Sequence, residues 1–91
     1  MSTASVLIHI EAERHSQDAK WGQQNHSPIE WMAILSEEMG EASKEALEYH
    51  WQGKHYPKDP ERLKRYRAEL VQVAAVAVAA IESLDRNELK S

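Results

Sequence analysis

The chain has 91 residues, enough for one small domain. Its 42% hydrophobic and 29% charged residues are ordinary for a globular chain. Only three glycines and three prolines, no phenylalanine, and plentiful alanine and glutamate favour helix, while the absence of cysteine excludes disulfides and thiolate zinc sites. The net charge of −4 argues against nucleic acid as the main partner, because phosphate binding needs a basic surface.

The N-terminal segment predicts a first helix over residues 6–20, after a frayed stretch at residues 1–5. Val6, Leu7 and Ile10 have helical spacing, and a polar run follows them. The apolar patch would also suit a strand, but the chain has no second strand-like segment to pair with it. The basic and long apolar segments of a signal peptide are not found here.

A loop over residues 21–27 leads into the clearest local signal of the chain. Ser27 fits a helix N-cap, Pro28 the first helical position, and Glu30 completes a capping box. These residues predict a second helix over residues 28–50. One apolar stripe runs along it, made by Met32, Leu35, Met39, Ala42 and Ala46.

The third predicted helix runs from about residue 60 to residue 84 or 85, with a polar tail that frays. Gly53 and Pro57 end the second helix, and Asp59 with Pro60 repeats the capping signature.

The second half of this third helix, residues 70–81, is apolar on every face except at Gln72. Such a helix must be covered on all sides, which two other short helices can hardly do. We therefore expect an all-α bundle of about three helices, completed as a homodimer or homotetramer. Its apolar run of about 12 residues is shorter than the roughly 20 of a membrane span, so we expect a cytoplasmic protein with no membrane partner.

Acidic residues gather on the second helix and at the start of the apolar run. Glu38 and Glu41 are three residues apart, which places them on one helix surface, and Glu69 and Gln72 repeat that spacing. If the two helices pack antiparallel, the two pairs face each other, as in carboxylate metal sites of bundles. Considered without Glu69 and Gln72, the acidic residues of the second helix are also consistent with an ordinary solvent-exposed helix face. A buried polar Gln72 needs a partner, which favours a site for a hard cation such as Mg²⁺.

The pattern resembles a known family. Glu37-Glu38-x-x-Glu41, followed after 27 residues by Glu69-x-x-Gln72, is similar to the EExxE…ExxD signature of MazG-type all-α nucleoside triphosphate pyrophosphohydrolases. The resemblance covers most of the chain, and residues 1–91 would form a single domain of this type. It implies hydrolysis of the α–β phosphate bond of a (deoxy)nucleoside triphosphate, which gives the monophosphate and pyrophosphate.

The resemblance also implies roles for the motif residues. Glu38, Glu41 and Glu69 would bind Mg²⁺, or Mn²⁺ in its place, and Glu37 would be a further catalytic acid that binds metal or orients the attacking water. The family has Asp where this chain has Gln72. An amide oxygen can still coordinate a metal, but one negative charge is lost. Gln72 is therefore expected as a neutral metal ligand.

Four further residues are candidates for binding the substrate. Trp21 can stack on a base and Asn25 can hydrogen-bond to it, since the base is held near this loop in the family. Lys54 in the second loop and Arg65, one turn before Glu69, can reach triphosphate oxygens. The five histidines show no zinc spacing and are expected to be structural or exposed.

Three other readings remain open. A relative without catalytic activity could bind nucleotides or regulate a partner, with Gln72 as the mark of lost chemistry. A purely structural helical oligomer would leave the acids as a solvated surface. A phosphoribosyl-ATP pyrophosphohydrolase shares the helical scaffold and acidic motifs.

Overall fold

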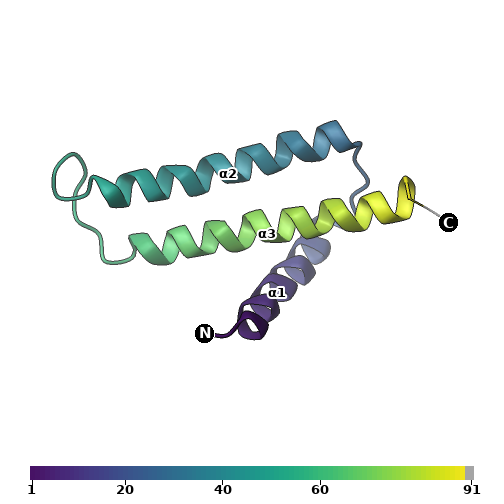
Figure 1. Cartoon of the computed structure of the whole chain (residues 1–91), viewed down its shortest axis with the longest axis horizontal. Helices are drawn as coiled ribbons and strands as arrows, with labels where there is room; N and C mark the ends of the chain where they lie inside the picture. Colours follow the sequence, from purple (N-terminus) through teal and green to yellow (C-terminus); the bar gives the residue numbers. More distant parts are fainter. Residues whose placement is uncertain (90–91) are drawn as a thin grey trace.

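The protein is made of three helices, as the sequence predicts. The computed structural model describes residues 1–89 and contains α1 (Thr3–Trp21), α2 (Pro28–His50) and α3 (Arg62–Asn87). Helices α2 and α3 lie side by side and run antiparallel (Figure 1). The all-α class is therefore confirmed for the described part of the chain.

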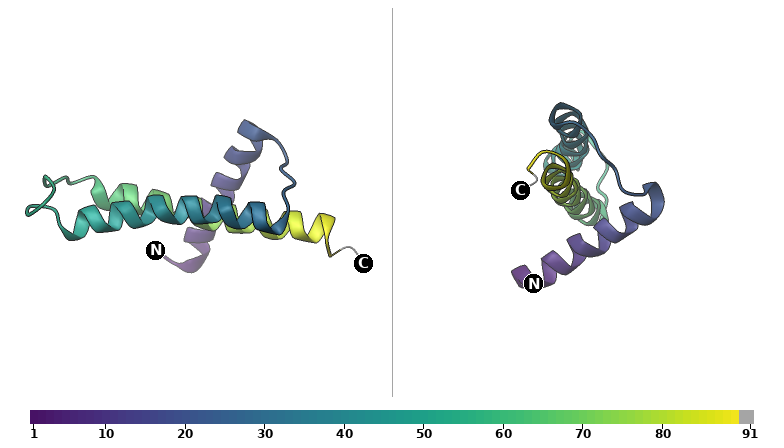
Figure 2. Two further views of the ribbon diagram at one scale, coloured as in Figure 1. Left: turned by 90° about the horizontal axis from the view of Figure 1, so that it is seen from above. Right: turned by 90° about the vertical axis from the view of Figure 1, so that its right-hand side faces the viewer.

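Helix α1 crosses the hairpin at a steep angle. Both views in Figure 2 show it inclined to the α2–α3 pair, and it packs on α3 rather than on α2. Among the described residues, no backbone contact joins α1 to α2.

The ends of α1 and the start of α2 follow from local backbone chemistry. Ser27 and Glu30 form the expected capping box, in which the Glu30 carboxylate accepts from Ser27 N at 2.8 Å. Gly22 ends α1 with φ of 73°, a left-handed value that a residue with a Cβ rarely adopts. The expected fraying is wrong for residues 3–5, which belong to α1, and the Ser2 side chain caps the helix by accepting from Ser5 N at 3.2 Å.

Helix α3 begins and ends slightly later than the sequence predicts. The residues before it form a turn in which Asp59 Oδ1 accepts from Glu61 N at 2.9 Å, so Asp59 satisfies a free N–H without starting the helix. At the other end α3 continues to Asn87, past the expected stop at residue 84 or 85. Residues 90–91 lie outside the described part.

A buried ion pair fixes the loop between α2 and α3. Arg62 is buried at the start of α3 and donates to Glu48 Oε2 of α2 at 2.6 Å and to the Pro57 carbonyl at 3.0 Å. Because a guanidinium brought out of water needs such partners, these bonds hold the two helices in register at this end.

The core of the single chain is small. Trp31 of α2 packs with Val76 and Ala79 of α3, flanked by partly buried apolar side chains. Many large apolar residues of the hairpin remain exposed: Ile29, Met32, Met39, Leu47, Leu63, Leu70, Val78, Ile81 and Leu84. Within residues 1–89, no helix is both long enough and apolar enough to cross a membrane.

Polar contacts attach α1 and its loop to α3. Arg14 pairs with Glu82 at 2.8 Å, and Gln17 donates to Gln72 at 3.1 Å. The loop after α1 is fastened by Asn25, whose Oδ1 accepts from Arg86 at 3.1 Å and from Asn87 at 2.9 Å. Because directional hydrogen bonds make these contacts, α1 has a defined position on the hairpin.

The capping box gives a first prediction. Replacing Ser27 with Ala should lower the free energy of unfolding by about 1 kcal/mol, because the Glu30 N–H loses its acceptor. Urea unfolding followed by circular dichroism measures this loss. Ser36→Ala, at an exposed position inside α2, is the control and should cost nothing. Equal unfolding midpoints for wild type and Ser27→Ala would contradict the role given to the cap.

Candidate metal and nucleotide site

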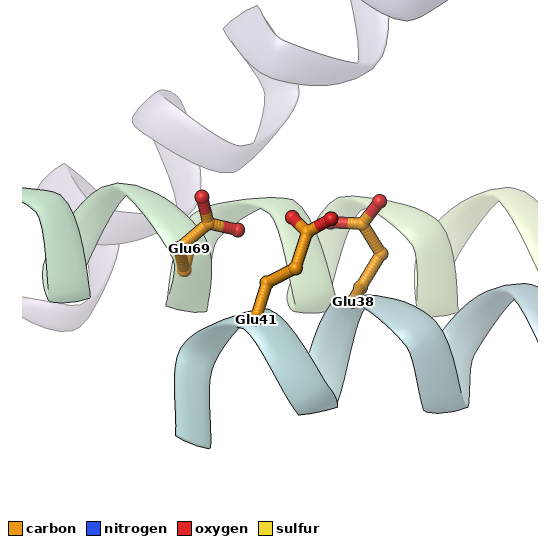
Figure 3. A group of neighbouring side chains, drawn as sticks. All are labelled: Glu38, Glu41 and Glu69. Atoms are coloured by element: carbon orange, nitrogen blue, oxygen red, sulfur yellow. The ribbon is translucent and has the colours of Figure 1, made fainter. Parts of the chain in front are cut away.

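Three carboxyl groups meet between α2 and α3. One oxygen from each of Glu38, Glu41 and Glu69 lies within 4.8 Å of the other two. Glu38 and Glu41 come from α2 and Glu69 from α3, and their carboxyl groups point toward one another (Figure 3). The antiparallel hairpin thus joins the two halves of the sequence motif into one cluster.

Burial and like charge raise the pKa of two of these acids. For Glu69 the pKa lies above its usual value, first because the carboxyl is desolvated, and then because of Glu41, Glu38 and Glu45. The pKa of Glu38 is also raised, by desolvation and then by repulsion from Glu41, Glu37 and Glu13. Negative charge is therefore concentrated in a place where water compensates it poorly.

The cluster fits a hard divalent cation. All its donors are carboxylate oxygens, the ligands that Mg²⁺ and Mn²⁺ prefer. Glu69 Oε2 is shielded from solvent and has no hydrogen-bond partner among the described residues. The neighbouring Glu41 contributes to the raised pKa of Glu69. At neutral pH a cation would satisfy this oxygen and relieve the repulsion.

Gln72 lies one turn after Glu69, but its oxygen is already in use. Gln72 Oε1 accepts from Gln17 Nε2 at 3.1 Å, and Gln17 Oε1 in turn accepts from Arg14 at 3.1 Å. Gln17 is only 7% exposed, so this pair of amides forms a buried link between α1 and α3. Gln72 therefore has the polar partner that its apolar surroundings require.

A cleft of about 190 Å³ adjoins the acidic cluster in the gap between α1 and α2. Its lining includes Glu38, Gln72 and Trp21 together with the apolar side chains of Ile34 and Val76. The cleft thus combines a charged end, a polar amide and a large aromatic ring, which are features of a small-molecule site.

Trp21 and Asn25 do not act as a pair here. Trp21 is 55% exposed, lines the cleft and carries Lys20 Nζ 4.7 Å from its ring centroid. Asn25 is instead turned toward the end of α3, where it accepts from Arg86 and Asn87. Of the two, only Trp21 lies beside the acids.

The two basic candidates lie toward the hairpin loop. Arg65 donates to Asp59 at 2.6 Å and pairs with Glu45 at 3.4 Å, so its charge is partly neutralised. Lys54 lies in the loop itself, with Nζ 5.7 Å from the Trp51 ring centroid. About nine residues of α2, or roughly 13 Å of helix, separate Glu41 from that loop. Neither residue lines the cleft.

The acid before the cluster and two residues of α1 complete the surroundings. Glu37 is exposed and acts on Glu38 through its charge. Glu13 and Gln17 of α1 were not predicted, because they belong to a polar run. Continuing the spacing of Val6 and Ile10 by helical turns leads to these two positions, but it does not show which helix each one meets: Gln17 contacts Gln72 of α3, and the charge of Glu13 acts on Glu38 of α2.

The raised pKa values give a prediction about stability and pH. When the pKa of an acid is higher in the folded than in the unfolded protein, proton binding favours the folded state. This stabilisation is fully present at a pH below the unfolded-state pKa of about 4.5, and it is lost as the pH rises through the folded-state pKa. Glu69→Gln should therefore have a higher melting temperature than wild type at pH 7, because it removes a carboxylate whose ionised form the fold disfavours. The difference in melting temperature between the variant and wild type should vanish near pH 4, where Glu69 is protonated in both states.

Thermal melts from pH 4 to pH 8 in EDTA measure this effect. The matched control is Glu11→Gln, which removes the same charge from an exposed position on α1. If the two variants shift the melting temperature equally at every pH, the cluster is not under electrostatic strain.

The comparisons with known proteins identify no family for the chain. No protein-family model, no curated protein and no solved structure matches it. The likeness to MazG-type enzymes therefore stands on the motif residues named above.

Proposed function

We propose that this protein is a Mg²⁺-dependent nucleoside triphosphate pyrophosphohydrolase. The observation that carries the proposal is the meeting of Glu38, Glu41 and Glu69 within 4.8 Å, at the edge of a cleft that Trp21 lines. The substrate is a (deoxy)nucleoside triphosphate, cleaved between the α- and β-phosphates, and such an enzyme would suit the removal of unwanted nucleotides.

The charge of the site supports a divalent ion as part of the substrate complex. Three carboxylates on one surface repel a triphosphate, so a nucleotide can approach this surface only with cations that offset both charges. Glu38, Glu41 and Glu69 would hold Mg²⁺ or Mn²⁺. When bound, the ion would neutralise phosphate charge and activate water.

The remaining residues bind and orient the nucleotide. Trp21 supplies an exposed ring at the cleft for stacking on the base, an interaction worth roughly 1–3 kcal/mol. Glu37, exposed beside Glu38, would bind metal or orient the attacking water. Arg65 and Lys54 remain candidates for the outer phosphates, while Asn25 acts through the loop that it fastens to α3.

A nucleotide-binding relative without catalysis is the second candidate. It is favoured by the bond between Gln17 and Gln72, which ties up an amide oxygen where the family has a metal-binding Asp. Such a protein would be stabilised by nucleotide with Mg²⁺ but would release no pyrophosphate. Gln72→Asp would then be expected to raise turnover.

We also propose that the active protein is a homodimer or a homotetramer. The exposed apolar side chains of the hairpin, among them Ile81 at 57% exposure and Leu70 at 44%, are more than a stable single chain of this size leaves in water. A second hairpin would supply the missing cover, as the all-round apolar character of α3 predicts.

Catalytic activity is measured as pyrophosphate release from canonical and modified nucleoside triphosphates with Mg²⁺ or Mn²⁺. Wild type should release pyrophosphate from at least one of them. Glu38→Gln, Glu41→Gln and Glu69→Gln should each lower the rate at least about 100-fold, because each removes a charged ligand. Glu11→Gln is the control, since its carboxylate is exposed and outside the cluster. If a folded protein that binds nucleotide releases pyrophosphate from none of the triphosphates, the result would favour the non-catalytic candidate.

The assembly prediction concerns the apolar surface of α3. Ile81→Glu should shift the protein toward a monomer, because a charge would be buried without a partner at the interface. Sedimentation velocity over a concentration series measures this shift. Lys64→Glu, which also adds negative charge but lies at a 77% exposed side chain, should leave the assembly intact. A wild-type protein that sediments as a monomer at every concentration would overturn the proposal.

A further inference from the structure

The orientation of the Gln72 amide follows from hydrogen bonds that begin at Arg14. A guanidinium only donates, so the Gln17 atom that faces Arg14 Nη1 at 3.1 Å must be the carbonyl oxygen. The Gln17 nitrogen therefore faces Gln72 and donates to its Oε1 at 3.1 Å. Both amides thus have one permitted orientation, whatever the usual ambiguity between amide O and N.

Burial and charge hold this arrangement in place. Gln17 is 7% exposed, and Arg14 is fixed by Asp18 at 2.9 Å and by Glu82 at 2.8 Å. Reversing the Gln72 amide would set two NH₂ groups against each other and leave a shielded donor without an acceptor. A shielded polar group without a partner is costly, so the reversed form is rare.

The free end of Gln72 is consequently a donor. Its oxygen is used by Gln17, and no hydrogen bond from Gln72 Nε2 exists within residues 1–89. Gln72 lines the cleft together with Glu38 and Trp21. An NH₂ group cannot coordinate a cation, but it can donate to an oxygen acceptor.

We propose that Gln72 is a substrate-recognition residue rather than a metal ligand. Its Nε2 donates to an oxygen of the nucleotide in the cleft, either a carbonyl of the base or an oxygen of the α-phosphate. Gln17 is the positioning residue that sets this direction. The inference rests on the proposed function, because it places the nucleotide between Trp21 and the acids, and it replaces the expectation that Gln72 coordinates Mg²⁺.

Two variants of Gln72 separate donation from coordination. Gln72→Met keeps the size and removes both polar atoms. Gln72→Glu keeps an acceptor for Gln17 and puts a carboxylate oxygen where the NH₂ group was. Gln23→Met is the control, because Gln23 is exposed and does not line this cleft.

Calorimetry with two kinds of probe gives the readout. Mn²⁺ alone should bind Gln72→Met within about twofold of wild type, and Gln72→Glu more tightly. The four common deoxynucleoside monophosphates, titrated in saturating Mg²⁺, should bind both variants about tenfold more weakly than wild type, or about 1.4 kcal/mol. Free nucleosides and inorganic phosphate, titrated in parallel, show whether the acceptor lies on the base or on the phosphate.

Each outcome decides a separate point. A loss of Mn²⁺ affinity of fivefold or more in Gln72→Met shows that Gln72 coordinates the ion and overturns the inference. Unchanged monophosphate affinity in both variants overturns it too, as does a wild-type protein that binds Mn²⁺ but no monophosphate. A wild-type protein that binds no Mn²⁺ contradicts the proposed function itself.

Discussion

The antiparallel packing of α2 on α3 is the constraint on which the rest of the structure depends. Trp31 packs with Val76 and Ala79 at one end of the pair, and the buried Arg62–Glu48 pair closes the other end. Between these two contacts the helices have little freedom to slide, so residues 28 positions apart in sequence, such as Glu41 and Glu69, must face each other. The apolar contacts thus offset the electrostatic cost of an acidic cluster.

The electrostatic repulsion within the acidic cluster determines the chemical character of the site. Raised pKa values at Glu38 and Glu69 mean that the ionised cluster destabilises the fold when nothing binds to it. A divalent cation would turn the same repulsion into affinity. Perturbed pKa values of this kind cluster at functional sites, although structural charge networks produce them too.

Helix α1 contributes through polar rather than apolar contacts. Arg14 and Gln17 attach it to α3, and the same bonds orient Gln72 in the cleft. One network of hydrogen bonds therefore both attaches α1 to α3 and fixes the orientation of the Gln72 amide.

The sequence by itself determined the helical class, the three elements, the start of α2 and the pairing of the two acidic motifs. These follow from local rules of capping, periodicity and turn chemistry. Only the tertiary structure decided that α1 crosses the hairpin, that Gln17 is buried and that Asn25 faces Arg86 rather than the cleft. The physical reason is that periodicity marks the inner face of a helix but not the neighbour it meets or the direction in which a polar side chain finds its hydrogen bond.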